Sequence, residues 1–281
     1  MNVFVPKEMD GLWHILENEP GAAVYAGGTD LLVRLRAGMD VPPALVCLER
    51  IGELQGIRDE GDTVFIGACT THTALLESGL IRDVLPVLHK AVRLLGSPPI
   101  RNMGTIGGNI CTASPAGDTL PPLYLADGEV EVRSRAGARR MGIDRFILGP
   151  GRTALENGEV LSGVRVKKGW GYDVHHFEKV GQRKAMAISI ASLAALVKTD
   201  ASGAVAKIRL SWGSVGPLVV TMPEVEEALT GRPLTIDTLR SVRHLVERNV
   251  SPISDIRAGE EYRRRVASNM LLRLAEDGRR P

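Results

Sequence analysis

Two short glycine-rich runs are the residues whose types and spacing could do chemistry in this sequence. Gly104, Gly107 and Gly108 fall within five residues, and a second pair, Gly27-Gly28, follows the apolar run Ala22–Tyr25. Short polar side chains surround the first run: Thr105, Asn109, Thr112 and Ser114. Glycine lets the backbone adopt positive φ and lets another molecule approach the main chain, and a row of bare N–H groups favours an anion. Either run alone could be an ordinary surface turn, but the two together indicate loops that hold both phosphates of a dinucleotide.

Other patterns argue against hydrolytic and metal chemistry. The sequence has no G-x-S-x-G elbow, and Cys47, Cys69 and Cys111 are too scattered for a disulfide framework, a zinc site or an iron–sulfur cluster. The adjacent His175-His176 pair would point to opposite faces of a strand. We therefore expect no catalytic acid, base or nucleophile and no metal ligand. The run 149–154 matches G-x-G-x-x-A, but no helix pattern follows it, so we interpret it as a loop at the edge of a cleft.

Composition and charge limit the classes of protein to which this chain can belong. The chain of 281 residues is 44% hydrophobic and has a net charge of +2, with 4% aromatic residues. Charge and aromatic content of this kind give no indication of nucleic-acid binding. No stretch reaches the roughly 20 apolar residues of a membrane span, and Met1–Pro6 does not begin like a signal peptide. We expect a cytoplasmic protein without a membrane span.

Five motifs in sequence order resemble those of the FAD-binding subunit of the molybdenum hydroxylases. That family includes carbon monoxide dehydrogenase, xanthine dehydrogenase and nicotinate dehydrogenase. The motifs are Ala26–Leu31, Thr105–Asn109, Ala113–Asp118, Phe177–Met186 and Ser251–Arg257. The resemblance implies an α+β fold with a two-part FAD-binding domain of the PCMH type (similar to vanillyl-alcohol oxidase) over residues 1–171. Its subdomains would cover about 1–55 and 56–171, and a small α+β C-terminal domain, an antiparallel sheet plus helices, would follow over 172–281.

The resemblance also implies which residues contact the cofactor. They are Val24, Tyr25, Ala26, Gly27, Gly28, Thr29, Asp30, Leu31, Thr105, Ile106, Gly107, Gly108, Asn109, Ser114, Asp118, Leu161 and Lys179. The first loop would wrap the pyrophosphate and the second would supply opposing N–H groups. Asp118 would lie near the polar part of FAD, Leu161 near the isoalloxazine, and Lys179 beside the flavin. Without the resemblance, these three would be a turn or cap acid, a strand core residue and a solvent-facing lysine.

By the same resemblance, the chain binds FAD non-covalently and transfers electrons. A large subunit would carry the molybdenum cofactor and a small one the 2Fe–2S clusters, in a dimer of heterotrimers. This chain would pass electrons from the clusters to an external acceptor. Two alternatives remain: a cofactor-free assembly subunit with the same fold, and a self-sufficient flavin oxidoreductase. Neither the substrate nor the acceptor can be identified from the sequence.

Hydrophobic periodicity predicts the elements that must position these residues. Ala22–Tyr25, residues 31–37 and Ala44–Leu48 predict a βαβ unit with Gly27-Gly28 in its first turn. An amphipathic helix over Asp83–Leu95, a turn at 96–99 and the open glycine loop should follow. Later elements are a hairpin across Gly137, strands over 159–166, 172–179 and 204–215, and helices over 223–229, 236–248 and 260–276, the last ended by Gly278. Over 185–197 an alanine-rich helix pattern and an alternating strand pattern compete, and the resemblance favours a strand.

Overall fold

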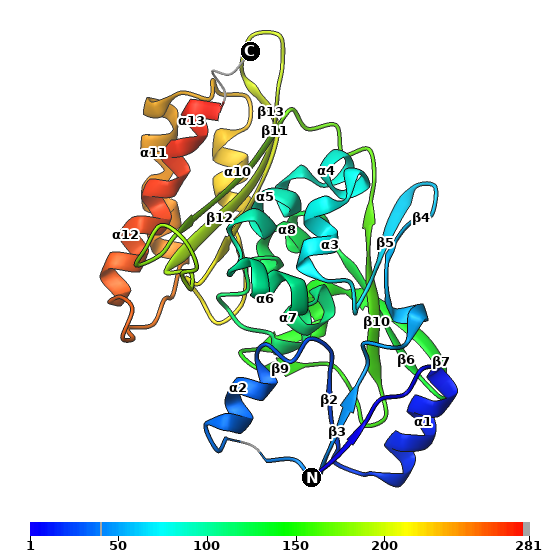
Figure 1. The fold of residues 1–281 in the computed structure, drawn as a ribbon. Helices are drawn as coiled ribbons and strands as arrows, with labels where there is room; N and C mark the ends of the chain where they lie inside the picture. Colours follow the sequence, from blue (N-terminus) through cyan, green and yellow to red (C-terminus); the bar gives the residue numbers. More distant parts are fainter. Residues whose placement is uncertain (40, 278–281) are drawn as a thin grey trace. The chain divides into compact units, whose positions relative to one another are not determined.

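Helices and mostly antiparallel strands alternate along the chain in the computed structural model, which describes residues 1–39 and 41–277 (Figure 1). The chain forms two compact units, and each is built from segments that are separate in the sequence. Unit 1 comprises Met1–Leu80, Ser97–Ala113 and Asp127–Lys168. Unit 2 comprises Ile81–Gly96, Ser114–Ala126 and the described residues from Gly169 onward. Gly278 lies outside the described residues.

Unit 1 begins with a parallel three-stranded sheet in the order β1-β3-β2. Its elements are β1 (Asn2–Phe4), α1 (Met9–Asn18), β2 (Ala23–Tyr25), α2 (Leu31–Arg36) and β3 (Ala44–Cys47). Helix α1 buries Met9, Leu12 and Trp13 in a cluster with Val46 and Leu48. The predicted βαβ unit is therefore confirmed, with Gly27-Gly28 between β2 and α2.

An antiparallel five-stranded sheet, β4-β5-β10-β6-β7, forms the larger part of unit 1. Val64, Ile66, Val130 and Val164 of its strands are fully buried, because alternate residues of these strands face the core. Its strands are β4 (Ile57–Asp59), β5 (Thr63–Gly67), β6 (Glu129–Ser134), β7 (Gly137–Gly142) and β10 (Val160–Lys167). The shorter elements of unit 1 are η1 (Gly52–Leu54), α3 (His72–Glu77), α6 (Pro98–Met103), α7 (Ile106–Thr112), α9 (Ile143–Phe146), β8 (Ile147–Gly149) and β9 (Arg152–Thr153).

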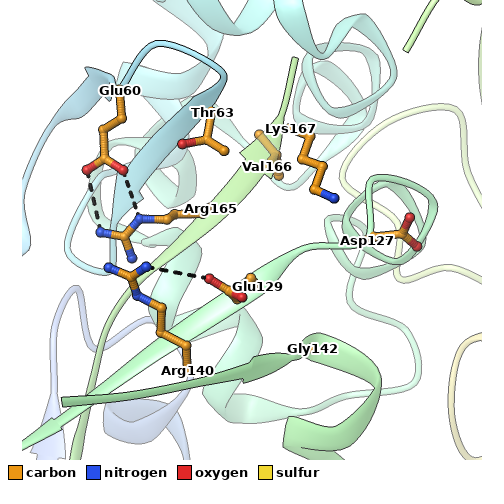
Figure 2. A pocket seen from close by; sticks show the side chains of 9 residues that line it. All are labelled: Glu60, Thr63, Asp127, Glu129, Arg140, Gly142, Arg165, Val166 and Lys167. Carbon is orange, nitrogen blue, oxygen red and sulfur yellow. Dashed lines mark hydrogen bonds and ion pairs between the residues drawn. The ribbon is translucent and has the colours of Figure 1, made fainter. Parts of the chain in front are cut away.

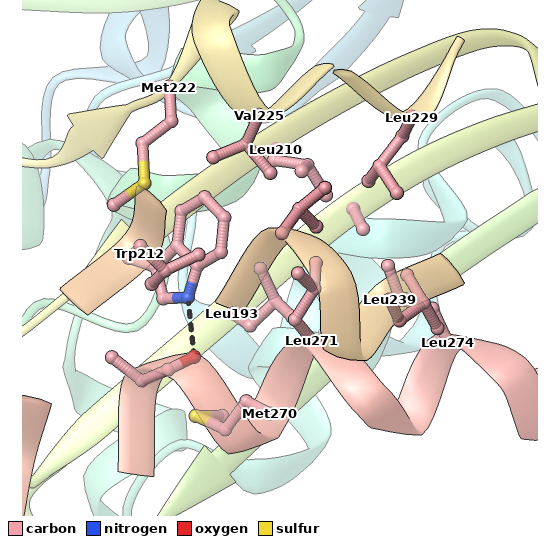
Figure 3. Packing of buried hydrophobic residues seen from close by; sticks show 14 of the residues in the cluster. Leu193, Leu210, Trp212, Met222, Val225, Leu229, Leu239, Met270, Leu271 and Leu274 are labelled. Atoms are coloured by element: carbon pink, nitrogen blue, oxygen red, sulfur yellow. Dashed lines mark hydrogen bonds between the residues drawn. The ribbon is translucent and has the colours of Figure 1, made fainter. Parts of the chain in front are cut away.

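Unit 2 packs helices on both faces of an antiparallel sheet, β11-β12-β13-β14. Trp212 lies at the centre of the core on one face, where its indole nitrogen donates to the carbonyl oxygen of Ala267 at 3.1 Å (Figure 3). The neighbouring Ser211 points to the other face and donates to the carbonyl oxygen of Pro121 at 2.9 Å. Its strands are β11 (Val174–Val180), β12 (Ala191–Thr199), β13 (Val205–Gly213) and β14 (Val220–Thr221). Its helices are α5 (Pro86–Leu94), α8 (Leu120–Leu125), α10 (Pro223–Leu229), α11 (Ile236–Asn249), α12 (Glu260–Met270), η2 (Leu271–Arg273) and α13 (Leu274–Asp277), and α4 (Gly79–Val84) begins in unit 1 and ends in unit 2.

Outside the glycine-rich runs, three sequence predictions of local structure are wrong. The helix expected over Asp83–Leu95 is two helices, α4 and α5, because Pro86 cannot donate a backbone hydrogen bond and instead begins α5. The expected turn at 96–99 starts α6, where the Ser97 hydroxyl accepts from the Ile100 N–H at 3.4 Å. The strand expected from residue 185 begins only at Ala191. The predicted hairpin across Gly137 and the helices from Pro223 and Ile236 are confirmed.

Candidate functional site

A small apolar cavity in unit 1 brings together residues from both glycine-rich runs. Its volume is about 110 Å³. Val24, Tyr25, Ala26, Gly107, Gly108 and Leu161, all predicted site residues, line it. The sequence reasoning missed the other lining residues: Leu48, Ala68, Cys69, Cys111, Leu155, Glu159 and Val160. The cavity thus lies where strand β2, the turn after β5, helix α7 and strand β10 meet.

The loop after β2 leaves its main-chain donors available. Gly28 adopts φ +65°, which glycine tolerates best. A Cβ at Gly27 would lie 1.6 Å from the carbonyl oxygen of Met103, so only glycine allows this loop to touch the end of α6. Among the described residues, none accepts a hydrogen bond from the N–H groups of residues 26–29. Unpaired N–H groups in such a loop suit an anionic ligand.

The second glycine run is not an open loop, and that expectation is wrong. Thr105 is the N-cap of α7, and its hydroxyl accepts from the N–H of Gly108 at 3.1 Å. The N–H of Gly107 donates to the carbonyl oxygen of Ala68 at 2.9 Å, and that of Ile106 donates to Thr70 at 3.0 Å. These N–H groups already have protein acceptors, so this run does not offer the free donors that the sequence suggested.

The two glycines of α7 instead have different packing roles. A Cβ at Gly107 would lie 2.5 Å from the Cβ of Ala68, so glycine is required for α7 to rest on the turn after β5. A Cβ at Gly108 would meet only the Thr105 hydroxyl, at 3.0 Å. Cys111 follows Gly107 by four residues and lies on the same side of the helix. Recognising α7 as a helix would therefore have identified Cys111 as a lining residue.

Most of the side chains that line the cavity are uncharged. Burial raises the pKa values of the Cys69 and Cys111 thiols to about 12, so both stay neutral at physiological pH. Burial, with a hydrogen bond to Cys47, raises the pKa of Tyr25 to about 12. The one carboxylate of the lining, Glu159, is bound at 2.7 Å by the Arg139 guanidinium. The hollow therefore suits an apolar, ring-like part of a ligand.

Three further predicted site residues lie in unit 2: Ser114, Asp118 and Lys179. Lys179 Nζ lies 2.6 Å from Asp118 Oδ2 and donates to the carbonyl oxygen of Leu94 at 2.8 Å. Both side chains are less than a tenth exposed, so neither the exposed-turn reading of Asp118 nor the solvent-facing reading of Lys179 holds. Asp118 Oδ1 is buried and has no protein partner. Burial raises the pKa of Asp118 to about 6, although the Lys179 ammonium acts in the opposite direction.

A larger hollow of about 380 Å³ lies mainly on strands of the five-stranded sheet, and four of the charged groups that line it form ion pairs with one another. Figure 2 shows Arg165 reaching Glu60, at 2.8 Å, and Arg140 reaching Glu129, at 3.9 Å. Beside them, burial raises the pKa of Glu131, but hydrogen bonds from Arg165, Ser162 and Arg140 more than offset it and hold the pKa at about 2. We interpret this surface as a network of salt bridges that braces the sheet, and we place the candidate site at the smaller, apolar cavity.

Three further observations concern the described part of the chain. None of its helices is long and apolar enough to span a membrane. Among residues 1–39 and 41–277, no three His, Cys, Asp or Glu side chains are grouped so that they could hold a metal ion. The G-x-G-x-x-A match at 149–154 forms the short β8–β9 hairpin, with no helix after it.

Comparisons with known proteins agree with this geometry. Residues 1–167 match the model of the FAD binding domain in molybdopterin dehydrogenase, and residues 176–277 match the CO dehydrogenase flavoprotein C-terminal domain. The chain is 32% identical to the nicotinate dehydrogenase FAD-subunit of Eubacterium barkeri, over 98% of this chain and 94% of that protein. It is 34% identical to the carbon monoxide dehydrogenase medium chain of Afipia carboxidovorans, over 91% of this chain and 88% of that protein.

A solved structure gives the same result for the fold. Reconstituted CO dehydrogenase from Oligotropha carboxidovorans contains a chain that superposes with a TM-score of 0.92 and 29% identity, covering 99% of this chain and 97% of that one. The expected α+β fold, a cofactor-binding part followed by a C-terminal part with an antiparallel sheet, is confirmed.

Proposed function

This chain belongs to the family of FAD-binding subunits of the molybdenum hydroxylases, and we propose that it binds FAD non-covalently and serves as the electron-output subunit of such a complex. Electrons would arrive from 2Fe–2S clusters on a small partner subunit, after substrate oxidation at the molybdenum cofactor of a large one. An external acceptor would then receive them from this chain.

The observation that carries the proposal is the pairing of a donor loop with an apolar hollow. The free N–H groups of residues 26–29 suit the pyrophosphate of a dinucleotide, and the adjoining cavity suits an uncharged ring system. Both features depend on glycines that no larger residue could replace without moving the backbone, Gly27 and Gly107. The residues present therefore fit FAD.

Bound FAD supplies a ring that accepts and releases electrons, while the protein supplies binding, orientation and electrostatics. We propose that residues 24–31 hold the pyrophosphate and that Leu161 packs against the ring and helps to exclude water. By resemblance, Thr105–Asn109 would also contact FAD, through the surface of α7 because its first N–H groups are engaged. We further propose Ser114, Asp118 and Lys179 as contacts, with the Lys179 ammonium favouring negative charge on the reduced cofactor.

The remaining proposals concern the assembly. We propose a dimer of heterotrimers in the cytoplasm, with a large molybdenum subunit and a small iron–sulfur subunit. The division into residues 1–171, with subdomains of about 1–55 and 56–171, and residues 172–281 stays a prediction about sequence domains. The medium-chain relatives support a multi-subunit assembly by their names.

The test is the flavin content of the purified chain and of one charge variant. Gly108→Asp introduces bulk and negative charge at the cavity, where the added Cβ meets the Thr105 hydroxyl at 3.0 Å. Gly52→Asp is the matched control in the same unit, because a side chain there meets nothing within 4 Å. We expect the parent and the control to bind FAD and to release all of it on acid precipitation, and Gly108→Asp to bind FAD at least about tenfold more weakly.

Each alternative has its own outcome. A parent chain that stays colourless with added FAD, alone and in the complex, would indicate the cofactor-free assembly subunit. Colour that remains in the acid pellet would contradict non-covalent binding. Full FAD retention by Gly108→Asp would show that the cavity is not part of the cofactor site.

A further inference from the structure

Asp118 and Lys179 form a buried ion pair that does not use all of its hydrogen-bonding groups. An ammonium group has three N–H donors. Two of those on Lys179 have acceptors, which are Asp118 Oδ2 at 2.6 Å and the carbonyl oxygen of Leu94 at 2.8 Å. Among the described residues, none accepts from the third donor, and Asp118 Oδ1 is buried without a protein partner. The pair therefore has one free donor and one free acceptor for a bound ligand.

The burial of the pair makes these two free groups informative. Both side chains are less than a tenth exposed, so bulk water solvates them poorly. A buried polar atom without a partner is uncommon in folded proteins and costs free energy. This observation supports, independently of the sequence motifs, the proposed contact between the pair and FAD.

Asp118 also determines how much of the Lys179 charge a ligand meets. When Asp118 is ionised, the two opposite charges lie 2.6 Å apart and largely cancel at distances longer than this separation. When Asp118 is protonated, the ammonium has only neutral partners, the carboxyl group and the Leu94 carbonyl oxygen. The net charge of the pair then changes from zero to +1. Positive charge close to a flavin favours its negatively charged reduced form.

The titration of Asp118 has to be considered with the charged groups around it. Burial raises its pKa to about 6, and the Lys179 ammonium acts against this rise. Lys90 of α5 donates to a backbone carbonyl oxygen of β11. Glu178, next to Lys179 on β11, points to the other face of that strand and lies 3.6 Å from Arg273. The titratable and charged groups on the surrounding elements are His89, Lys90 and Arg93 of α5, Tyr124 of α8, His175, His176 and Glu178 of β11, Lys198 of β12, and Lys207 and Arg209 of β13.

We propose that Asp118 is a positioning residue for electron transfer. Its carboxylate holds the Lys179 ammonium and cancels its charge, and protonation of Asp118 exposes that charge to the cofactor and raises the reduction potential of bound FAD. The inference rests on the proposed function, in which Lys179 contacts the reduced cofactor. The chain should therefore hold electrons more tightly in acid than the proton uptake of the flavin itself would produce.

The experiment measures the two-electron midpoint potential of FAD bound to the full chain, by anaerobic reductive titration at pH 5, 6, 7 and 8. Asp118→Asn keeps the shape of the side chain but cannot ionise, so the ammonium charge stays exposed at every pH. At pH 8 we expect the variant to favour reduced FAD at least about tenfold more than the parent does, a rise of about 30 mV. At pH 5, where Asp118 of the parent is mostly protonated, the two proteins should differ by less than about twofold.

Two further variants separate charge from structure. The double variant Asp118→Asn/Lys179→Gln has no charge at the pair, so it should match the parent at pH 8 and favour reduced FAD about tenfold less than the parent at pH 5. This comparison tests the proposal even where Asp118→Asn alone does not retain FAD. Asp237→Asn is the control for a lost carboxylate, because the Asp237 side chain is 85% exposed on α11 of the same unit. It should follow the parent at every pH.

Each contrary outcome overturns the proposal. Equal potentials of parent and Asp118→Asn at pH 8 would show that Asp118 does not set the charge at the cofactor. A difference of the same size at pH 5 and pH 8 would indicate a disturbed site instead of a lost ionised group. Equal potentials of Asp118→Asn and the double variant would mean that the ammonium does not act on FAD. Failure of the proposed function is separate, because it appears as absence of FAD from the parent protein.

Discussion

At the level of single residues, burial and ion pairing have opposite effects on the pKa of Asp118. Its side chain is 9% exposed, one oxygen is paired with Lys179 and the other has no protein partner. Desolvation disfavours the charged carboxylate, while the nearby ammonium favours it. Burial is the larger effect here and raises the pKa from 3.8 to about 6. The ionised form of Asp118 therefore lowers the free energy of unfolding relative to the protonated form.

This difference gives a pH dependence of defined sign. Between pH 3.8 and about 6 the folded protein binds more protons at Asp118 than the unfolded chain does, so stability should fall as pH rises through this window. Asp118→Asn removes the titration and should remove this fall, which amounts to at most about 3 kcal/mol. The measurement is the free energy of unfolding of FAD-free parent and variant by urea at pH 4, 5, 6 and 7. Equal pH slopes in the two proteins would mean that the Lys179 ammonium cancels the effect of burial.

Thr105 gives a second residue-scale prediction. Its hydroxyl caps α7 by accepting from the Gly108 N–H. Thr105→Ala should lower the free energy of unfolding by about 1 kcal/mol, because the Gly108 N–H loses its acceptor in a part-buried hydrogen bond, whereas Thr105→Ser should keep most of it. Urea midpoints of the three proteins provide the check. If Ser and Ala variants are equally destabilised, the lost methyl packing matters and the cap does not.

At the scale of elements, the two glycines of α7 should respond in opposite ways. Gly107→Ala places a Cβ 2.5 Å from Ala68 Cβ and should destabilise the protein by about 1–3 kcal/mol through overpacking. Gly108→Ala should change stability by less than about 1 kcal/mol, since alanine favours a helix and only the Thr105 hydroxyl must yield. Gly108 lines the cavity, so the added methyl group should weaken FAD binding instead. Thermal or urea unfolding beside FAD titration separates the two effects, and a Gly107→Ala protein of parental stability would contradict the packing described for α7.

The same element shows what the sequence could not predict about the backbone around the cavity. The motifs singled out Gly107 and Gly108, and both line the cavity. They did not reveal a helix, because two consecutive glycines disfavour one locally and the stabilising contact with Ala68 comes from a distant turn. Pro86 is a local signal that does mark a helix boundary, because it begins α5. Lining residues such as Leu48 and Val160 carry no motif, so only the fold brings them to the hollow.

At the scale of the whole molecule, alternation and helical periodicity predicted most elements of unit 2, including α10 and α11 with nearly the observed bounds. The periodicity could not show that residues 81–96 and 114–126 pack in unit 2, because no local pattern records which sheet a helix will cover. Helix α5 buries Val87, Leu88, Ala91 and Val92, and its apolar face predicts burial without naming the partner.

The whole-molecule prediction concerns what the chain does without partners. The described residues group no ligands for a metal ion, and the proposed function places substrate oxidation on another subunit. The isolated chain with FAD should show no flavin bleaching under anaerobic conditions with purines, carbon monoxide or N-heterocycles. Bleaching should appear with the substrate of the complex once both partner subunits are added. Reduction of the single chain by an organic substrate would favour a self-sufficient flavin oxidoreductase.

The segmented course of the chain also matters while the protein is being synthesised. Helices α5 and α8 emerge from the ribosome well before β11, β12 and β13, the strands on which they pack in unit 2. Until about residue 213 has left the exit tunnel, the aliphatic side chains of both helices remain exposed. Exposed aliphatic surface of this kind favours aggregation or chaperone binding. A chain that ends after Lys168 contains every segment of unit 1 but lacks the strands that bury α5 and α8. Such a nascent or truncated product should therefore be recognised by chaperones or proteases.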